Sequence, residues 1–195
     1  MDESGFRFRQ QPSGSGPTVQ RILATLPSWF GIPSSVDDYV AVADRSPTVI
    51  ATLDDDVGFL TTVLHSPHAA EIYVMGIDPH YHRQGIGRQM LALAESALVV
   101  EGVEYLQVKT LSSTQPDDGY AKTRAFYLAN GFRELEELPT LWDANNPALQ
   151  DGEAALTIKR PENGGPDSPP PVRWLQASAL RSGDPHLCRI RRRGL

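Results

Sequence analysis

Residues 71–87 read Glu71-Ile72-Tyr73-Val74-Met75-Gly76-Ile77-Asp78-Pro79-His80-Tyr81-His82-Arg83-Gln84-Gly85-Ile86-Gly87. The apolar alternation at the start of this stretch predicts a strand that stops at Pro79, and a helix is expected from Gly85 to about residue 100. A helix start leaves backbone N–H groups unpaired and carries partial positive charge. Glycines at 85 and 87 remove the Cβ atoms that would keep a ligand away from these groups. The stretch therefore predicts an anion site, with a pyrophosphate as its expected guest.

Two other phosphate-binding motifs do not fit this loop. A dinucleotide fingerprint needs a third glycine where the chain has Met90, and it belongs on the first strand–helix unit, whereas about three strands precede this loop. A P-loop needs Gly-Lys followed by Ser or Thr, but Gly87 is followed by Arg88 and Gln89. From the loop alone, a glycine-rich turn without a ligand stays open.

The chain divides into three parts. Residues 1–17, rich in Gly, Ser, Gln and Pro, are expected to form an irregular lead-in, and residues 161–195 a Pro- and Arg-rich disordered tail. Between them, residues 18–160 form one expected domain. Helices are predicted over 19–26, 34–43, 85–100 and 120–129, and strands over 48–53, 57–64, 71–78, 103–109, 132–138 and 154–159. Gly76, inside a strand, predicts a bulge or a close approach of another group to the backbone.

Composition and charge argue against several functional classes. The 195 residues carry a net charge of −6; six Arg and three acidic residues give residues 161–195 a charge of +3, so residues 1–160 carry −9. An acidic domain argues against nucleic-acid binding, which needs clustered Lys and Arg, and modestly favours cationic partners such as amines. With no long apolar run, no signal-like N-terminus and one cysteine, Cys188, we expect a cytoplasmic protein without a disulfide. Pro67 between His65 and His68 argues against a shared helix face, and no metal site is expected.

Two motifs together resemble the GNAT acetyltransferase superfamily. In the first, residues 71–87, a strand ending near a proline leads into a loop of the form (Arg/Gln)-x-x-Gly-x-(Gly/Ala) and a helix. The second, about forty residues later, is Ala125-Phe126-Tyr127 followed by Gly131-Phe132. The resemblance covers roughly residues 18–160. It departs from the family pattern at His82, where Arg or Gln is usual, and at Tyr120, where many members have an Asn that contacts the cofactor, so that contact is not carried over.

The resemblance implies an α/β fold of the GNAT type, a mixed and mostly antiparallel sheet with helices on both faces. In this fold the sheet splays after the motif strand, and acyl-CoA wedges into the opening. The loop is then expected to bind the pyrophosphate, and the strand backbone to pair with the pantetheine arm. The implied cofactor-binding residues are Met75, Gly76, Ile77, His82, Arg83, Gln84, Gly85, Ile86, Gly87 and Arg88. Acetyl-CoA is the implied co-substrate.

The resemblance also implies the catalytic roles. Tyr127 matches the family's general acid, with a purely structural core aromatic as the alternative; Glu71 matches a position where some members hold a general base, with a surface carboxylate as the alternative. The implied function is acetyl transfer from acetyl-CoA to a primary amine, on a small molecule or a peptide, by direct attack in a ternary complex. The alternative is a non-catalytic acyl-CoA-binding module. The acceptor is not readable from the sequence, no membrane partner is expected, and a homodimer is left open. The candidates for an acceptor pocket, or else for aromatic core, are Trp29, Phe30 and Trp142.

Overall fold

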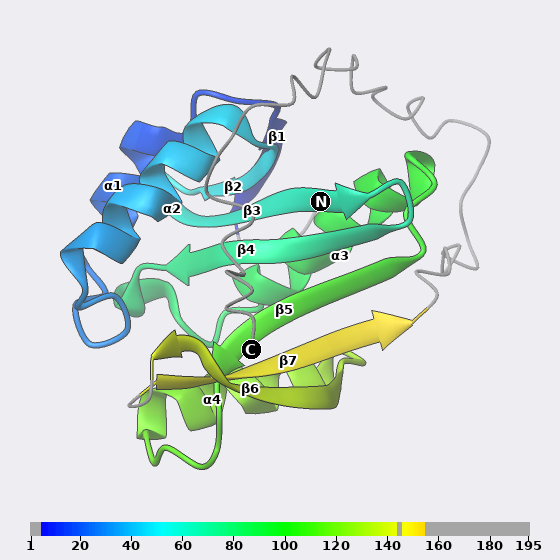
Figure 1. Ribbon diagram of the computed structural model, residues 1–195. Helices are drawn as coiled ribbons and strands as arrows, with labels where there is room; N and C mark the ends of the chain where they lie inside the picture. The colour runs from blue at the N-terminus through cyan, green and yellow to red at the C-terminus, as the bar shows by residue number, and fades with distance from the viewer. Residues whose placement is uncertain (1–4, 144–145, 155–195) are drawn as a thin grey trace, which may run out of the picture.

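The computed structural model describes residues 5–143 and 146–154. Within them, seven strands form one sheet in the order β1-β2-β3-β4-β5-β7-β6 (Figure 1). Every neighbouring pair is antiparallel except β4–β5, which is parallel. The strands are β1 (Arg7–Gln11), β2 (Thr48–Thr52), β3 (Asp56–Ser66), β4 (Ala69–Ile77), β5 (Tyr105–Leu111), β6 (Arg133–Asp143) and β7 (Asn146–Ala154). The expected mixed, mostly antiparallel α/β sheet is confirmed.

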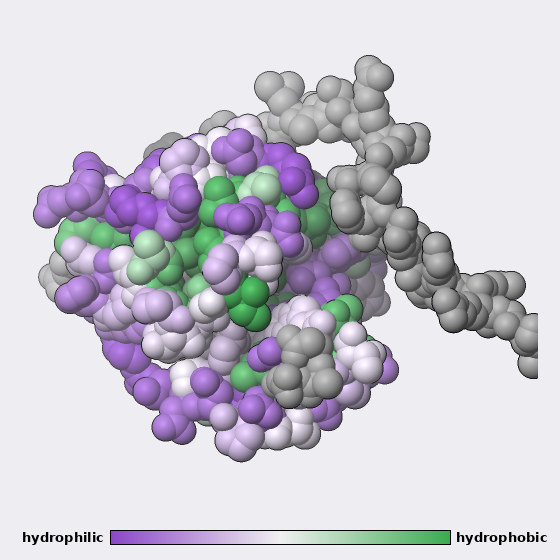
Figure 2. All heavy atoms as spheres, turned by 60° about the vertical axis from the view of Figure 1, so that its left-hand side comes forward, coloured by the Kyte–Doolittle hydropathy of each residue, from purple (hydrophilic) through white to green (hydrophobic). Residues whose placement is uncertain are grey.

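Helices cover both faces of this sheet. They are α1 (Gly16–Leu23), α2 (Pro33–Arg45), the 3-10 helix η1 (Pro79–Tyr81), α3 (Ile86–Val100) and α4 (Asp118–Ala129). In Figure 1, α1 and α2 lie at the left, and α3 and α4 pass behind the strands. Figure 2, in which that left-hand side comes forward, shows a mainly hydrophilic surface with apolar residues gathered toward its middle. No helix in the described part of the chain is both long enough and apolar enough to cross a membrane.

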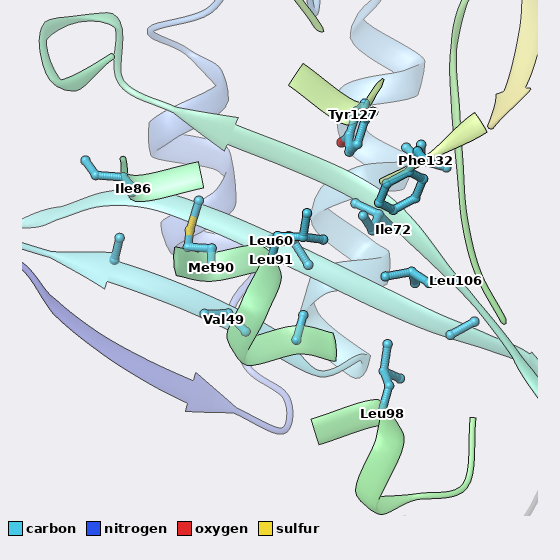
Figure 3. Packing of buried hydrophobic residues seen from close by; sticks show 14 of the residues in the cluster. Val49, Leu60, Ile72, Ile86, Met90, Leu91, Leu98, Leu106, Tyr127 and Phe132 are labelled. Atoms are coloured by element: carbon cyan, nitrogen blue, oxygen red, sulfur yellow. The ribbon is translucent and has the colours of Figure 1, made fainter. Parts of the chain in front are cut away.

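Two apolar clusters fix the helices to the sheet. The larger cluster packs α3 and α4 against one face, and Figure 3 shows its central side chains, among them Leu60, Ile72, Met90, Leu106 and Tyr127. The smaller cluster packs α1 and α2 against the other face through residues such as Val19, Ile22, Phe59 and Val74. Apolar residues spaced three or four apart on each helix account for this burial. The sheet is thus a central layer with a separate core on each side.

The parallel strands β4 and β5 separate part-way along their length. Their pairing ends at Ile72 opposite Val108. Directly afterwards the register of β4 against β3 shifts, so that Tyr73 has no cross-strand partner in that ladder. Such a bulge bends a strand and increases its twist. Figure 1 shows β4 and β5 diverging toward their C-terminal ends. The splay expected after the motif strand is present, and it leaves the β5-facing backbone of the end of β4 without a strand partner among the described residues.

The structure corrects two local expectations and decides between the two alternatives of a third. Residues 7–11, expected within an irregular lead-in, form the edge strand β1. The last strand in the described part of the chain is β7 at Asn146–Ala154, most of which was not expected to be a strand. Except for Ala154, the strand expected at 154–159 lies outside the described residues, as does the expected tail. The bulge lies at Tyr73 and not at Gly76. The other alternative expected for Gly76, a close approach of another group, is confirmed, since a Cβ there would lie 2.8 Å from Cε1 of Phe59.

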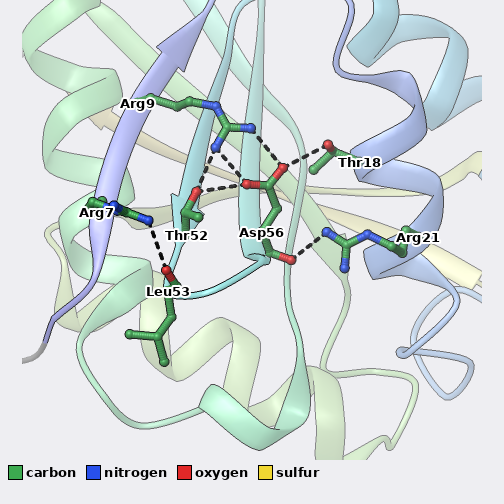
Figure 4. Close-up of polar contacts among 7 residues, drawn as sticks. All are labelled: Arg7, Arg9, Thr18, Arg21, Thr52, Leu53 and Asp56. Carbon is green, nitrogen blue, oxygen red and sulfur yellow. Dashed lines mark hydrogen bonds and ion pairs between the residues drawn. The ribbon is translucent and has the colours of Figure 1, made fainter.

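Polar contacts hold β1 in place (Figure 4). The Arg9 guanidinium donates to both carboxylate oxygens of Asp56, at 2.7 and 2.8 Å. The hydroxyls of Thr52 and Thr18 donate to the same carboxylate at 2.8 and 3.1 Å, and Arg21 donates to the Asp56 backbone carbonyl at 2.8 Å. These bonds, led by the one from Arg9, lower the pKa of Asp56 to about 2. One carboxylate therefore connects β1, β2, β3 and α1.

Candidate functional site

The loop between β4 and α3 presents a candidate anion site at the start of the helix. Asp78 accepts from the His80 backbone N–H at 3.0 Å, which shapes the turn after the strand. Arg83 and Gly85 then take left-handed backbone conformations, with φ of 64° and 81°. The first backbone N–H bonded along this helix is that of Gln89, which donates to the Gly85 carbonyl at 3.2 Å. The N–H groups that precede it at the helix start are therefore available to a ligand.

The side chains of this loop divide between scaffold and ligand roles. Nε2 of His82 donates to the Ile77 carbonyl at 2.7 Å, so His82 connects the loop to the end of β4. Arg83 and Arg88 are exposed on either side of the helix start, where guanidinium groups would reach a phosphate. The loop thus offers backbone donors and two exposed cations to one anion.

The two glycines act differently from each other. Gly85 faces open space, and its left-handed conformation is the one that favours glycine. Gly87 is buried, and a Cβ on it would lie 3.1 Å from the Phe126 ring and 3.4 Å from Ile77. The expectation that both glycines make room for a phosphate is therefore corrected for Gly87. Its missing side chain lets α4 pack closely against the start of α3.

Tyr127 lies on α4 within the larger core cluster (Figure 3). Its ring makes edge-on contacts with Phe126 and Phe132, each at a centroid distance of 5.2 Å. Burial, followed by the negative charge of Asp151, raises the pKa of Tyr127 well above its ordinary value. The phenol is therefore held in its protonated form. A residue of this kind can donate a proton to a strongly basic group, and it is also part of the core.

Glu71 lies on β4 within the paired part of the sheet, and its side chain is 7% exposed. Its Oε2 atom is 2.6 Å from Nε2 of His65 on β3 and accepts a hydrogen bond from the Lys109 ammonium on β5. The carboxylate is thus buried and paired on both sides, which rules out the surface-carboxylate alternative. The sequence singles out His65 only as a possible metal ligand and gives no indication of a role for Lys109. The available signal was a glutamate at a buried strand position, which requires a cationic partner nearby.

Glu71 and Tyr127 lie on opposite faces of the sheet. Ile72 belongs to the cluster that contains Tyr127, and side chains alternate between the two faces of a strand. The neighbouring Glu71 accordingly faces the side of α1 and α2, where its charge acts on Tyr39 and Tyr73. The two candidate catalytic groups are thus separated by the sheet, close to the point where β4 and β5 part.

Aromatic residues surround the site on the α1–α2 side. The Trp29 ring meets the His82 ring edge-on at 6.3 Å, and the Tyr120 hydroxyl donates to the Trp29 carbonyl at 3.1 Å. Tyr120, which replaces an Asn of the family pattern, therefore connects α4 to the α1–α2 connection. A second group, Phe30, Tyr39 and Tyr73, forms a chain of edge-on contacts. Trp142, the third aromatic pocket candidate, is an exposed residue of β6.

Other features of the molecule lie outside this arrangement. A cavity of about 360 Å³ between α1 and α2, bordered by Gln20, Asp37 and Asp44 among others, shares none of the candidate residues. In the described ranges, no three His, Cys, Asp or Glu side chains gather as a metal ion would require. The candidate site is therefore the loop, the end of β4, Tyr127 and the buried Glu71.

Comparison with known proteins agrees with this geometry. Residues 38–134 match the family model of the acetyltransferase (GNAT) domain. The fold is similar to that of a GNAT-family protein from Desulfovibrio desulfuricans, with 21% identity, coverage of 78% of this chain and 99% of the other, and a TM-score of 0.67. Comparison with curated proteins gives no sequence match.

Two further solved structures share the fold. A GNAT family acetyltransferase from Elizabethkingia anophelis, solved with acetyl-CoA bound, has 14% identity, covers 78% of this chain and 99% of its own, and has a TM-score of 0.61. The ribosomal-protein-S18-alanine N-acetyltransferase from Escherichia coli has 19% identity, coverages of 82% and 99%, and a TM-score of 0.61. At such identities the likeness concerns the fold alone.

Proposed function

Because the chain belongs to the GNAT superfamily of acetyltransferases, we propose that it transfers an acetyl group from acetyl-CoA to a primary amine. The observation that carries this proposal is the helix start with free N–H groups, placed at the end of a strand whose parallel neighbour has separated from it. A pyrophosphate fits the first feature, and an extended pantetheine arm fits the second, because both lie at one end of β4.

The residues present suit acetyl-CoA as the co-substrate. The backbone N–H groups at the start of α3, with Arg83 and Arg88, hold the pyrophosphate. The backbone of Met75–Ile77 pairs with the pantetheine amides, since no strand among the described residues pairs with it on the β5 side. The same backbone donors polarise the thioester carbonyl and stabilise its developing negative charge.

The proposed reaction places its two proton transfers on opposite faces of the sheet. A primary amine is mostly protonated at neutral pH and cannot attack until it loses a proton. Glu71 accepts that proton from the α1–α2 side. The neutral amine attacks the thioester carbon, the carbon–sulfur bond breaks, and the departing thiolate takes a proton from Tyr127. The second proton of the amine nitrogen then passes to the Tyr127 phenolate and restores the phenol.

A panel of amines and short peptides, incubated with acetyl-CoA and followed by thiol release, tests the proposal. We expect release above the hydrolysis background with at least one acceptor. Tyr127→Phe should lower kcat about 100-fold, as loss of a general acid does, and should leave the affinity for acetyl-CoA by calorimetry unchanged. Tyr105→Phe, an exposed tyrosine of β5, is the matched control.

Two outcomes would contradict the proposal. Tight acetyl-CoA binding without thiol release for any acceptor would favour the alternative, a non-catalytic acyl-CoA-binding module. Absence of acetyl-CoA binding would remove both functions. Normal turnover by Tyr127→Phe would exclude this tyrosine as the proton donor and leave it a core aromatic.

A further inference from the structure

Glu71 is enclosed by two partners of unequal exposure. Its own side chain is 7% exposed, that of Lys109 is 21% exposed, and that of His65 is 40% exposed. The three residues come from adjacent strands, β4, β5 and β3. Of the two groups bonded to the carboxylate, the imidazole therefore has the larger contact with solvent.

This enclosure creates a requirement if Glu71 is the base, so the inference rests on the proposed function. An ammonium acceptor brings one proton more than the products retain, and that proton must reach water in every turnover. Glu71 is too buried to release it directly. Lys109 cannot accept it, because an ammonium group has no lone pair. The imidazole of His65 has a basic nitrogen and is exposed.

We propose that His65 is the proton exit of the active site, which carries the proton taken by Glu71 to solvent. The N–H bond of the acceptor ammonium breaks as an O–H bond forms on Glu71. At rest, Nε2–H of His65 donates to the carboxylate across the 2.6 Å Oε2–Nε2 contact. Once Glu71 is protonated, the ring exchanges with water to its Nδ1–H tautomer and takes the Glu71 proton on Nε2. Nδ1 then gives its proton to water, which restores the resting tautomer. The carboxylate is regenerated, and no electron is gained or lost.

The other charged groups around this pair do not compete for the proton. Lys109 balances the charge of the buried carboxylate from β5. From β4 and α2, Tyr73 and Tyr39 face the pair; burial raises the pKa of Tyr73 and raises that of Tyr39 to about 12, so both stay protonated. The more distant Asp38 and Arg45 on α2 act on the pKa of Tyr73 with opposite signs.

A second histidine provides a matched control. His68, three residues after His65 and in the same hairpin, pairs with Glu104 at 3.0 Å, and both of these side chains are more than half exposed. His68→Gln removes an imidazole from the same hairpin without touching Glu71. His65→Gln keeps a polar side chain of similar length that cannot relay a proton.

The experiment measures kcat/KM against pH for wild type, His65→Gln and His68→Gln, with the amine of highest turnover in the panel. We expect the kcat/KM of His65→Gln to be about tenfold below that of wild type at pH values where the amine is protonated. At high pH it should approach the wild-type value, because a neutral amine leaves no proton to export. His68→Gln should follow wild type throughout. An unchanged profile, or a loss of equal size at every pH, would overturn the relay while leaving the acetyl transfer intact.

A measurement without any acceptor separates the relay from the proposed function. Ring ¹⁵N signals of His65 and His68 report the tautomer of each imidazole. We expect Glu71→Gln to change the His65 signals and to leave those of His68 unchanged. Insensitivity of His65 to this substitution would overturn the relay even if wild type is active. Absence of thiol release in wild type would refute the proposed function, and the relay with it.

Discussion

Asp151 is a buried carboxylate that the proposed reaction does not use. It lies on β7 and is 1% exposed, and within the described residues neither of its carboxylate oxygens has a hydrogen-bond partner. Burial, followed by the charge of Glu134, raises the pKa of Asp151 to about 6, although Arg124 opposes the shift. A buried charge without a partner is costly, so the folded protein favours the neutral acid. The ionised form at neutral pH is therefore a source of instability.

We predict that Asp151→Asn stabilises the protein at about pH 7.5. Because the folded pKa is raised, the contribution of this carboxyl to stability is fully present below its ordinary value of 3.8 and is lost as the pH rises through about 6. Removing the charge should raise the free energy of unfolding by about 1–2 kcal/mol at about pH 7.5 and change it little near pH 4. Urea unfolding measures this, with the exposed Asp54→Asn as control. No gain at the higher pH would mean that the carboxylate is satisfied.

Among the elements, the corner formed by β1, β3 and α1 depends on Asp56. Its pKa is lowered to about 2, first by the hydrogen bond from Arg9, so its contribution to stability is present above the ordinary value of 3.8 and is lost as the pH falls through about 2. Since Arg9 is partly exposed and screened by solvent, we expect Asp56→Asn to lower the free energy of unfolding by about 1 kcal/mol near pH 7. The difference from wild type should vanish near pH 2.

Chemical denaturation of Asp56→Asn and wild type near pH 7 and near pH 2 tests this expectation. Faster hydrogen exchange in β1 should accompany the loss of stability near pH 7. Asp55→Asn, an exposed neighbour in the same turn, is the control and should behave as wild type. Equal stability of Asp56→Asn and wild type near pH 7 would mean that β1 is held by its ladder to β2 alone.

Strand β1, in this corner, differs from the elements that could be predicted from the sequence. Helices α3 and α4 and strands β2 to β5 carry their own periodicity, and their positions were predicted to within a few residues. Strand β1 reads Arg-Phe-Arg-Gln-Gln, which contains a single apolar residue, Phe8, and it is held by Asp56 from 47 residues away. The bulge at Tyr73 depends on the register between β3 and β4, which neither strand specifies alone.

Across the whole molecule, the parts of the site that lie within one short segment could be predicted from the sequence. The parts that different strands bring together could not. The loop around Gly85 and the Phe-Tyr pair on α4 are short motifs with a fixed relation to one helix each. The partners of Glu71 come from two other strands, 6 and 38 residues away in the sequence. Only the sheet order, with β4 between β3 and β5, brings His65 and Lys109 to the same carboxylate.

The sheet also divides the proposed substrates between two sides, and this division can be tested. The proposed pyrophosphate site lies at the start of α3, whereas Glu71 and Tyr39 face the side of α1 and α2. Arg88→Glu places a negative charge beside the pyrophosphate and should weaken acetyl-CoA binding about tenfold, by an amount that shrinks as salt is added. It should not change the KM of the amine.

Tyr39→Leu keeps an apolar side chain against Phe30 and Tyr73 but removes a hydroxyl near Glu71. It should raise the KM of the amine severalfold and leave acetyl-CoA affinity unchanged, the reverse of Arg88→Glu. Calorimetry measures the acetyl-CoA affinity of both variants, and steady-state kinetics measures their KM for the amine. If both variants affected the same ligand, the two substrates would share one side of the sheet, and the assignment of Glu71 as the base would fail because the acceptor would not reach it.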